Sequence, residues 1–206
     1  MVEPFSARLR WLVEPAQVDP ALARQLVGCW RDVSNAGGAV GFPFLPVSDE
    51  EVRPAVDSLL ASLDPHLDRL LVAEVGEQLA GWLLVAGSTS PLSRHWARVR
   101  HVQTSLEHRG KGVGRALMAE AARSAREDLH LRHLRLEVRA GMGLEDFYGH
   151  LGWQVAGRWP QALRLADEDL RDEVLMVLPL RQPIPADDDA GPRTHRPRRA
   201  GRSEGS

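Results

Sequence analysis

The chain has few of the residues that would place it in a disulfide scaffold, a membrane or a nucleic-acid complex. It has one cysteine, Cys29, which rules out an intramolecular disulfide and a multi-cysteine zinc site. Its formal net charge of -2 gives no sign of a basic, nucleic-acid-binding domain. No apolar run reaches the roughly 18 residues of a membrane span, and the opening residues MVEPFSARLR lack the apolar stretch of a secretory signal. We therefore expect a cytoplasmic protein that binds neither nucleic acid nor membrane.

The composition changes once along the chain, near Arg181. Residues 182–206 are rich in Pro, Gly, Asp and Arg, and Ile184 is their only large aliphatic residue. Such a segment buries too little apolar surface to offset the entropy lost on ordering. We expect one folded domain over residues 1–181 and a disordered tail over residues 182–206.

Helical and strand periodicities alternate through the folded part. Asp19 before Pro20, and Ser48 with Glu51 three residues later, predict the starts of two helices. Apolar residues at helical spacing predict two more helices, over residues 112–129 and near residues 144–151. Alternation and short apolar runs predict seven strands, over residues 6–13, 69–75, 78–86, 97–106, 133–139, 153–159 and 173–180. This order predicts an α/β protein with a mixed sheet and helices on its faces.

The most informative stretch is Val102–Gly114, where a predicted strand passes through a short loop into a helix. Residues Arg109–Gly114 read RGKGVG, with glycine at three alternate positions. Glycine amides can approach an anion closely, and the helix that follows adds free N–H groups and a positive dipole end. Arg109, Lys111 and Arg115 add positive charge. The stretch therefore fits a pyrophosphate.

Two other pyrophosphate motifs fail on spacing. A P-loop requires Ser or Thr after its lysine, whereas Gly112 follows Lys111. A dinucleotide fingerprint requires Gly-x-Gly-x-x-Gly after the first strand, whereas this turn follows at least four predicted strands. A glycine-rich turn without any ligand remains the alternative.

Arg109–Gly114 resembles the Arg/Gln-x-x-Gly-x-Gly/Ala signature of the GNAT superfamily of N-acetyltransferases. The resemblance continues in LRLEV at residues 134–138, FYGHLGW at residues 147–153 and GGAVGF at residues 37–42, and it spans residues 6–180. The last two motifs are similar to the branch of tabtoxin-resistance-type acetyltransferases. The resemblance implies a GNAT-like, mostly antiparallel mixed sheet of about six or seven strands flanked by about four helices, in the α/β (α+β) class.

The resemblance also implies an enzyme that binds acetyl-CoA and needs no metal. The pantetheine arm would pair like an extra strand with Val102, Gln103 and Thr104. The pyrophosphate would lie on the turn and the start of the helix, at Arg109, Gly110, Lys111, Gly112, Val113, Gly114 and Arg115. Gly141 departs from the family pattern, because many members carry an asparagine there that contacts pantetheine.

Tyr148 is the only tyrosine, and it falls where GNAT enzymes often carry the acid that protonates the departing CoA thiolate. A phenol with a pKa near 10 gives its proton to a thiolate with a pKa of about 8.5 only at a cost, which a depressed phenol pKa would reduce. The phenol can hydrogen-bond the sulfur in either case. The alternative is a tyrosine that packs on the core beside Leu144 and Leu151.

Glu137 is the candidate base, because it stands where the tabtoxin-resistance branch has an acidic residue and an amine must be neutral to attack. The alternative is a surface glutamate paired with Arg135 or Arg139. His101 is a weaker candidate, and Glu107 and His108 are expected in solvent. The branch also tends to carry an acid near the start of the cofactor strand, where this chain has Arg98 and Arg100.

The predicted reaction is transfer of the acetyl group of acetyl-CoA to a primary amine of a small molecule, by direct attack in a ternary complex. A protein or peptide N-acetyltransferase and an inactive CoA-binding module are the alternatives, and a homodimer stays open. Aromatic residues are expected either in the walls of the acceptor site or in the core. These are Trp30, Phe42, Phe44, Trp96 and Trp159.

Overall fold

The helix caps in the sequence form the helices that they predict. In the computed structural model, which describes residues 7–38, 41–42 and 44–180, the Asp19 carboxylate accepts a hydrogen bond of 2.8 Å from the Leu22 N–H at the start of α1 (Pro20–Asn35). Ser48 and Glu51 form the expected capping box of α2 (Asp49–Ala61). The later helices are α3 (Val113–Glu127) and the short α4 (Leu144–Gly149).

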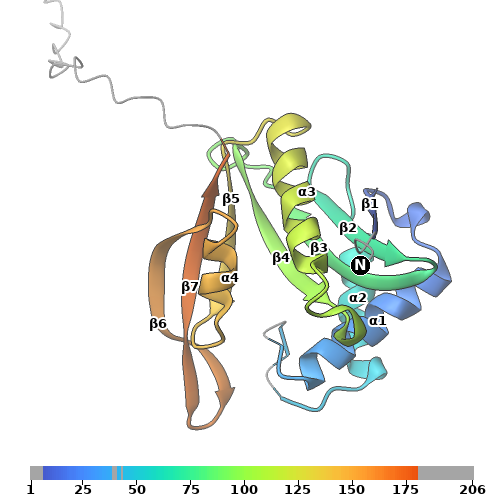
Figure 1. Cartoon of the computed structure of the whole chain (residues 1–206), viewed down its shortest axis with the longest axis horizontal. Helices are drawn as coiled ribbons and strands as arrows, with labels where there is room; N and C mark the ends of the chain where they lie inside the picture. Colours follow the sequence, from blue (N-terminus) through green and yellow to red (C-terminus); the bar gives the residue numbers. More distant parts are fainter. Residues whose placement is uncertain (1–6, 39–40, 43, 181–206) are drawn as a thin grey trace, which may run out of the picture.

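Seven strands form one sheet in the order β1-β2-β3-β4-β5-β7-β6 (Figure 1). They are β1 (Arg8–Leu12), β2 (Asp68–Val75), β3 (Gln78–Ala86), β4 (Trp96–Thr104), β5 (His133–Arg139), β6 (Gln154–Ala166) and β7 (Asp169–Pro179). β4 and β5 are parallel, and the other neighbouring strands of the described sheet are antiparallel. The predicted mixed, mostly antiparallel sheet is confirmed.

Helices cover both faces of the sheet, so the central strands are buried on both sides. In β2, Leu70 and Val72 pack in the cluster that includes α1 and α2, whereas Leu71 and Ala73 pack in the cluster that includes α3. Alternate residues of one strand thus belong to two separate cores. Full burial of each leucine stabilises the fold by roughly 1.5–3 kcal/mol.

The pairing of β4 with β5 stops early, and this opens the sheet. Only Trp96–Arg98 of β4 pair with His133–Arg135 of β5 in the described chain. Beyond that point β4 carries a bulge: from Leu84 to Trp82 the partner β3 advances two residues, while β4 advances three, from Arg100 to Gln103. His101, inside the bulge, has a φ of 53°. A bulge bends its strand and increases its twist, and the two strands meet at one end and diverge toward the other (Figure 1).

The hairpin of β6 and β7 extends beyond the predicted strands, which stopped at Trp159 and resumed at Glu173. Residues 160–172 show no clear apolar alternation, and their pairing comes from the partner strand. The Asp172 carboxylate accepts hydrogen bonds from the Gln161 N–H at 2.9 Å and from Arg158 at 3.2 Å. β6 tolerates Pro160 because it is an edge strand.

The disordered tail and the lack of a membrane span are both predicted from the sequence. The expected tail, residues 182–206, lies outside the described residues. In the part of the chain that the structure describes, no helix combines the length and apolar character needed to cross a bilayer.

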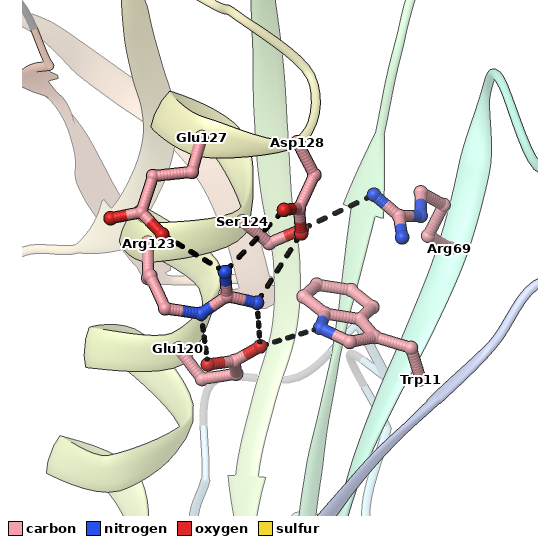
Figure 2. A network of polar contacts seen from close by, with 7 residues as sticks. All are labelled: Trp11, Arg69, Glu120, Arg123, Ser124, Glu127 and Asp128. Carbon is pink, nitrogen blue, oxygen red and sulfur yellow. Dashed lines mark hydrogen bonds and ion pairs between the residues drawn. The ribbon is translucent and has the colours of Figure 1, made fainter.

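A polar network fastens the outer side of α3 to β1 and β2 (Figure 2). Glu120 accepts hydrogen bonds of 2.8 Å from both the Trp11 indole N–H and Arg123. Arg69 donates to the Ser124 hydroxyl at 3.2 Å and places its guanidinium 4.8 Å from the centre of the Trp11 ring. The network also includes Glu127 and Asp128. It fixes the position of the helix that begins directly after the glycine-rich turn.

The Glu120→Gln variant should be less stable than the wild type by about 0.5–1 kcal/mol at pH 7, because it loses an ion pair within a network. Hydrogen bonds from Arg123 lower the pKa of Glu120 from its ordinary value of 4.5. A carboxylate with a lowered folded-state pKa stabilises the fold above pH 4.5 and loses this contribution as the pH falls through the folded-state value. Urea unfolding should therefore show the two proteins converging below pH 4.5.

Glu127→Gln is the matched control on the same helix. Its carboxylate is more exposed and bonds Arg123 at 3.1 Å, so its loss should change the free energy of unfolding by about 0.3 kcal/mol. Equal effects of the two variants at pH 7 would contradict the importance of the Trp11 contact.

Candidate active site

The divergence of β4 and β5 opens a cavity of about 880 Å³. The end of α1 and residues 98–104 of β4 form one part of its wall. Residues 136–138 of β5, the turn before α3, and three residues of α4 form the rest, together with Glu173 of β7. Most of the residues predicted for the site therefore surround one space.

The glycine-rich turn adopts a backbone that requires glycine. Gly110 and Gly112 have φ values of 74° and 87°, a region that costs other residues roughly 1–2 kcal/mol. Gly112 caps α3, and the first N–H within the helix to find an acceptor is that of Ala116, which bonds the Gly112 carbonyl at 3.0 Å. The N–H groups of the three preceding residues lack an intrahelical acceptor. Together with the helix dipole, they fit an anionic group.

Gly81 of β3 brings the start of α3 close to the sheet. A Cβ atom at this position would lie 2.6 Å from the carbonyl oxygen of Gln103 and 2.9 Å from Val113 Cγ1. Only glycine permits this approach, which sets the helix N-terminus beside the end of β4. Sequence analysis missed this residue, because a single glycine within an apolar strand gives no local signal of a close contact.

Within the described residues, no strand lies beside the β5-facing edge of β4 along the cavity. Gln103 and Thr104 pair with Trp82 and Gly81 of β3 on one side, whereas the ladder with β5 ends at Arg98. Main-chain groups of residues 102–104 are thus available to an extended ligand that adds to the sheet edge. An edge of this kind next to an anion site fits a long chain that carries a diphosphate, as in acetyl-CoA.

Tyr148 of α4 lies in the cavity wall and in the core at once. Its side chain is 6% exposed, and its ring makes edge contacts with Phe147 and Trp153 at centroid distances of 5.0 and 6.0 Å. Leu144 and Leu151 pack against the same core, as the alternative interpretation predicted. Burial raises the pKa of Tyr148 to about 12. The phenol is therefore neutral and suited to donating a hydrogen bond, and it lacks the depressed pKa that would reduce the cost of proton transfer.

Glu137 faces the cavity from β5 and pairs with an arginine of the neighbouring strand. Its carboxylate lies 3.3 Å from the guanidinium of Arg98 on β4; the ion pairs with Arg135 or Arg139 that the alternative interpretation considered are absent among the described residues. Arg98, which departs from the pattern of the tabtoxin-resistance branch, thus contacts the candidate base directly.

Glu173 is a cavity residue that sequence analysis missed. The only signal was a carboxylate at the start of a mostly apolar strand. Burial raises the pKa of Glu173 above its ordinary value, and the negative charge of Glu137 raises it further, while Arg98 opposes both effects.

Two histidines line the cavity but pack against the protein. The ring of His101 lies 4.6 Å from that of Trp30 and 5.8 Å from that of Trp82 between centroids. Burial, aided by Arg100, lowers the pKa of His101 to about 4. His108 is 8% exposed, with Nδ1 2.8 Å from the Ser105 hydroxyl, so the expectation that it lies in solvent is wrong. In residues 7–38, 41–42 and 44–180, no group of three or more His, Cys, Asp or Glu residues is placed to hold a metal.

None of the five aromatic residues considered for the acceptor site lines the cavity, whose aromatic wall is Phe147 and Tyr148. Trp30 packs in the core, with edge contacts to Phe42 and Trp82. Core packing, the alternative interpretation, is therefore the correct one for Trp30. Phe44 and Trp159 are exposed on the surface, and Trp96 stacks with Arg135.

Cys29, the only thiol of the chain, should not react with an aromatic disulfide reagent such as DTNB in the native protein. It is 8% exposed, and burial raises its pKa to about 12, so very little of the reactive thiolate forms. We expect one thiol to be labelled at pH 8 after unfolding in guanidinium and none before it. Rapid labelling of the folded protein would contradict the burial of Cys29.

Comparison with known proteins identifies the family of the chain. The model of the acetyltransferase (GNAT) family matches residues 39–153, more than half of the 206-residue chain. A search of the curated proteins found no match.

Solved structures of acetyltransferases share the fold. The yncA protein of Salmonella typhimurium, solved with its cofactor acetyl-CoA, has a TM-score of 0.65 and 16% identity over 92% of this chain and 99% of its own. A GNAT acetyltransferase of Streptococcus pneumoniae has a TM-score of 0.64 and 20% identity over 84% and 98%. Nourseothricin acetyltransferase is 30% identical over 58% of this chain and 69% of its own, with a TM-score of 0.50. The chain thus belongs to the acetyltransferase (GNAT) family, and acetyl-CoA is its acetyl donor.

Proposed function

We propose that this acetyltransferase transfers the acetyl group to a primary amine of a small molecule, by direct attack in a ternary complex. The observation that carries the proposal is that one cavity joins the glycine-rich turn, the free edge of β4, Tyr148 and Glu137. Donor and acceptor can therefore meet without an acetylated enzyme intermediate. The burial of Cys29 supports direct attack, because the only thiol of the chain is a poor nucleophile.

Main-chain groups supply most of the proposed donor site. The diphosphate lies on the turn and the first amides of α3, contributed by Arg109, Gly110, Lys111, Gly112, Val113, Gly114 and Arg115. The pantetheine arm pairs with Val102, Gln103 and Thr104. These residues belong to the proposed catalytic domain, residues 1–181, and the proposal gives residues 182–206 no part in catalysis.

The proposed reaction moves two protons and exchanges one bond for another. The amine loses a proton to Glu137, directly or through water, and its nitrogen forms a bond to the acetyl carbonyl carbon. The C–S bond breaks, and the sulfur leaves as a thiolate that accepts a hydrogen bond from Tyr148 and then takes a proton from water. Full proton transfer from a phenol with a pKa of about 12 to a thiolate with a pKa of about 8.5 is uphill by about 5 kcal/mol. The main role of Tyr148 is therefore to stabilise developing negative charge on the sulfur through a hydrogen bond.

A small acceptor is favoured by the similarity to nourseothricin acetyltransferase, which is named for a small compound. The rival functions are acetylation of a protein or peptide amine and CoA binding without turnover. Thiol release measured over amines, amino acids, aminoglycosides and peptides separates the three. Turnover of peptides alone, or of no acceptor, would overturn the proposal.

Acetyl-CoA at 100 times its Kd should stabilise the wild type by about 2.7 kcal/mol, because it binds the folded state selectively. Gly112→Ala should show a smaller stabilisation at the same concentration. The variant should also lose about 1–2 kcal/mol of stability without ligand, because alanine is strained at a φ of 87°. Thermal melting with and without acetyl-CoA measures both effects.

Gly157→Ala is the matched control, since this glycine has an ordinary φ and a Cβ atom there meets nothing within 4 Å. It should keep the full stabilisation by acetyl-CoA. The donor site is wrong if Gly112→Ala binds as tightly as the wild type.

Tyr148→Phe should lower kcat roughly 100-fold, at the lower end of what one hydrogen-bond donor to developing negative charge contributes. The Kd of acetyl-CoA should not change, because the ring and its packing remain. Steady-state thiol release with the best acceptor gives kcat, and thermal shift gives the cofactor affinity. Unchanged turnover in this variant would remove Tyr148 from the mechanism.

A further inference from the structure

A second carboxylate shares the acceptor side of the cavity with Glu137. In the antiparallel pair of β5 and β7, Glu137 is the partner of Leu175, and Arg139 is the partner of Glu173. Partnered residues leave the sheet on the same face, so Glu137 and Glu173 are diagonal neighbours on one face, with backbones about 7–8 Å apart. Both line the cavity, and this distance allows two long side chains to converge on one bound group.

The charges that surround the two glutamates are unequal. Arg98 of β4 pairs with Glu137 at 3.3 Å, and Arg100 of β4 also lines the cavity. Arg139 directs its guanidinium to the sulfur of Met142, at 3.9 Å. Glu173 has no cation within ion-pair distance in the described part of the chain, and the residue opposite it on β6 is the uncharged Trp159. A cationic ligand would supply the missing partner.

We propose that Glu173 and Glu137 form a carboxylate pair that binds the acceptor's ammonium group and takes one proton from it. The inference rests on the proposed function and identifies the acceptor as an amine that arrives as a cation. One N–H bond of the ammonium breaks and one carboxylate O–H bond forms. The freed lone pair of the nitrogen then attacks the acetyl carbonyl carbon, the C–S bond breaks, and the nitrogen loses its second proton to water as the amide forms.

Two neighbouring carboxylates suit this step better than one. Together they accept hydrogen bonds from two of the three N–H groups of the ammonium, which orients the nitrogen. Two like charges in a buried site also hold a shared proton more tightly than either carboxylate alone. The direction of the pKa of Glu173 agrees with this, since burial and the charge of Glu137 both raise it, and a base is most effective when its pKa lies near the working pH.

The first test compares Glu173→Gln with its neighbour Asp172→Asn. Glu173→Gln should lower kcat/KM for the amine about 100-fold and leave the stabilisation by acetyl-CoA unchanged. Asp172 bonds Arg158 and Gln161 on the opposite face of the sheet, so Asp172→Asn should change kcat/KM by no more than about twofold. Glu173→Asp, which keeps the charge, should recover part of the lost activity.

The second test uses the pH dependence of kcat/KM, which a purely structural role would not shift. Glu137→Gln removes the charge that helps to raise the pKa of Glu173, so the acidic limb should move to lower pH. Arg98→Gln removes the charge that lowers the pKa of Glu173, so the limb should move to higher pH. These opposite shifts decide the case even if Glu173→Gln folds poorly.

The carboxylate pair would be overturned by equal kcat/KM values for the wild type and Glu173→Gln. It would also be overturned if the acidic limb of the pH profile stayed in place in both Glu137→Gln and Arg98→Gln. Neither result would contradict the proposed function. A wild type that is stabilised by acetyl-CoA but neither binds nor acetylates any amine would overturn the proposed function and this inference with it.

Discussion

Three residue pairs join β4 to β5, and the cavity of the candidate site opens where this pairing stops. β4 and β5 share a ladder only over residues 96–98 and 133–135. The bulge at His101 then bends β4 away, so that its edge and the inner face of β5 become walls of one cavity. The N-terminus of α3 lies beside the end of β4, and Val113, Gly114 and Arg115 line the same cavity.

Burial acts on two cavity residues in the same direction and suits them to different tasks. It raises the pKa of Tyr148, which keeps the phenol protonated and able to donate a hydrogen bond. It also raises the pKa of Glu173, which makes a carboxylate more ready to accept a proton. Under the proposed function, the sulfur leaves at Tyr148 on one side of the cavity and the amine enters beside Glu137 and Glu173 on the other.

Local chemistry was sufficient to predict the elements and the turn. Asp19, Ser48 and Glu51 cap the helices that they predict. Within RGKGVG, Gly110 and Gly112 adopt the positive φ values that glycine permits. Features set by distant partners were not predictable. The bulge at His101 depends on the register with β3, the long hairpin depends on the pairing of β6 with β7, and the position of Glu173 depends on which strand lies next to β5. His108 looks like a solvated loop residue until the fold covers it.

The free edge of β4 offers backbone amides and carbonyls, which stay the same whatever side chains the strand carries. Binding through such main-chain groups does not depend on the side chains of the strand, whereas Glu137 of β5 and Glu173 of β7 line the cavity with side chains that a single codon change can replace. Under the proposed function, substitutions at Glu137 and Glu173 can therefore change which acceptor binds without changing how the edge of β4 binds acetyl-CoA.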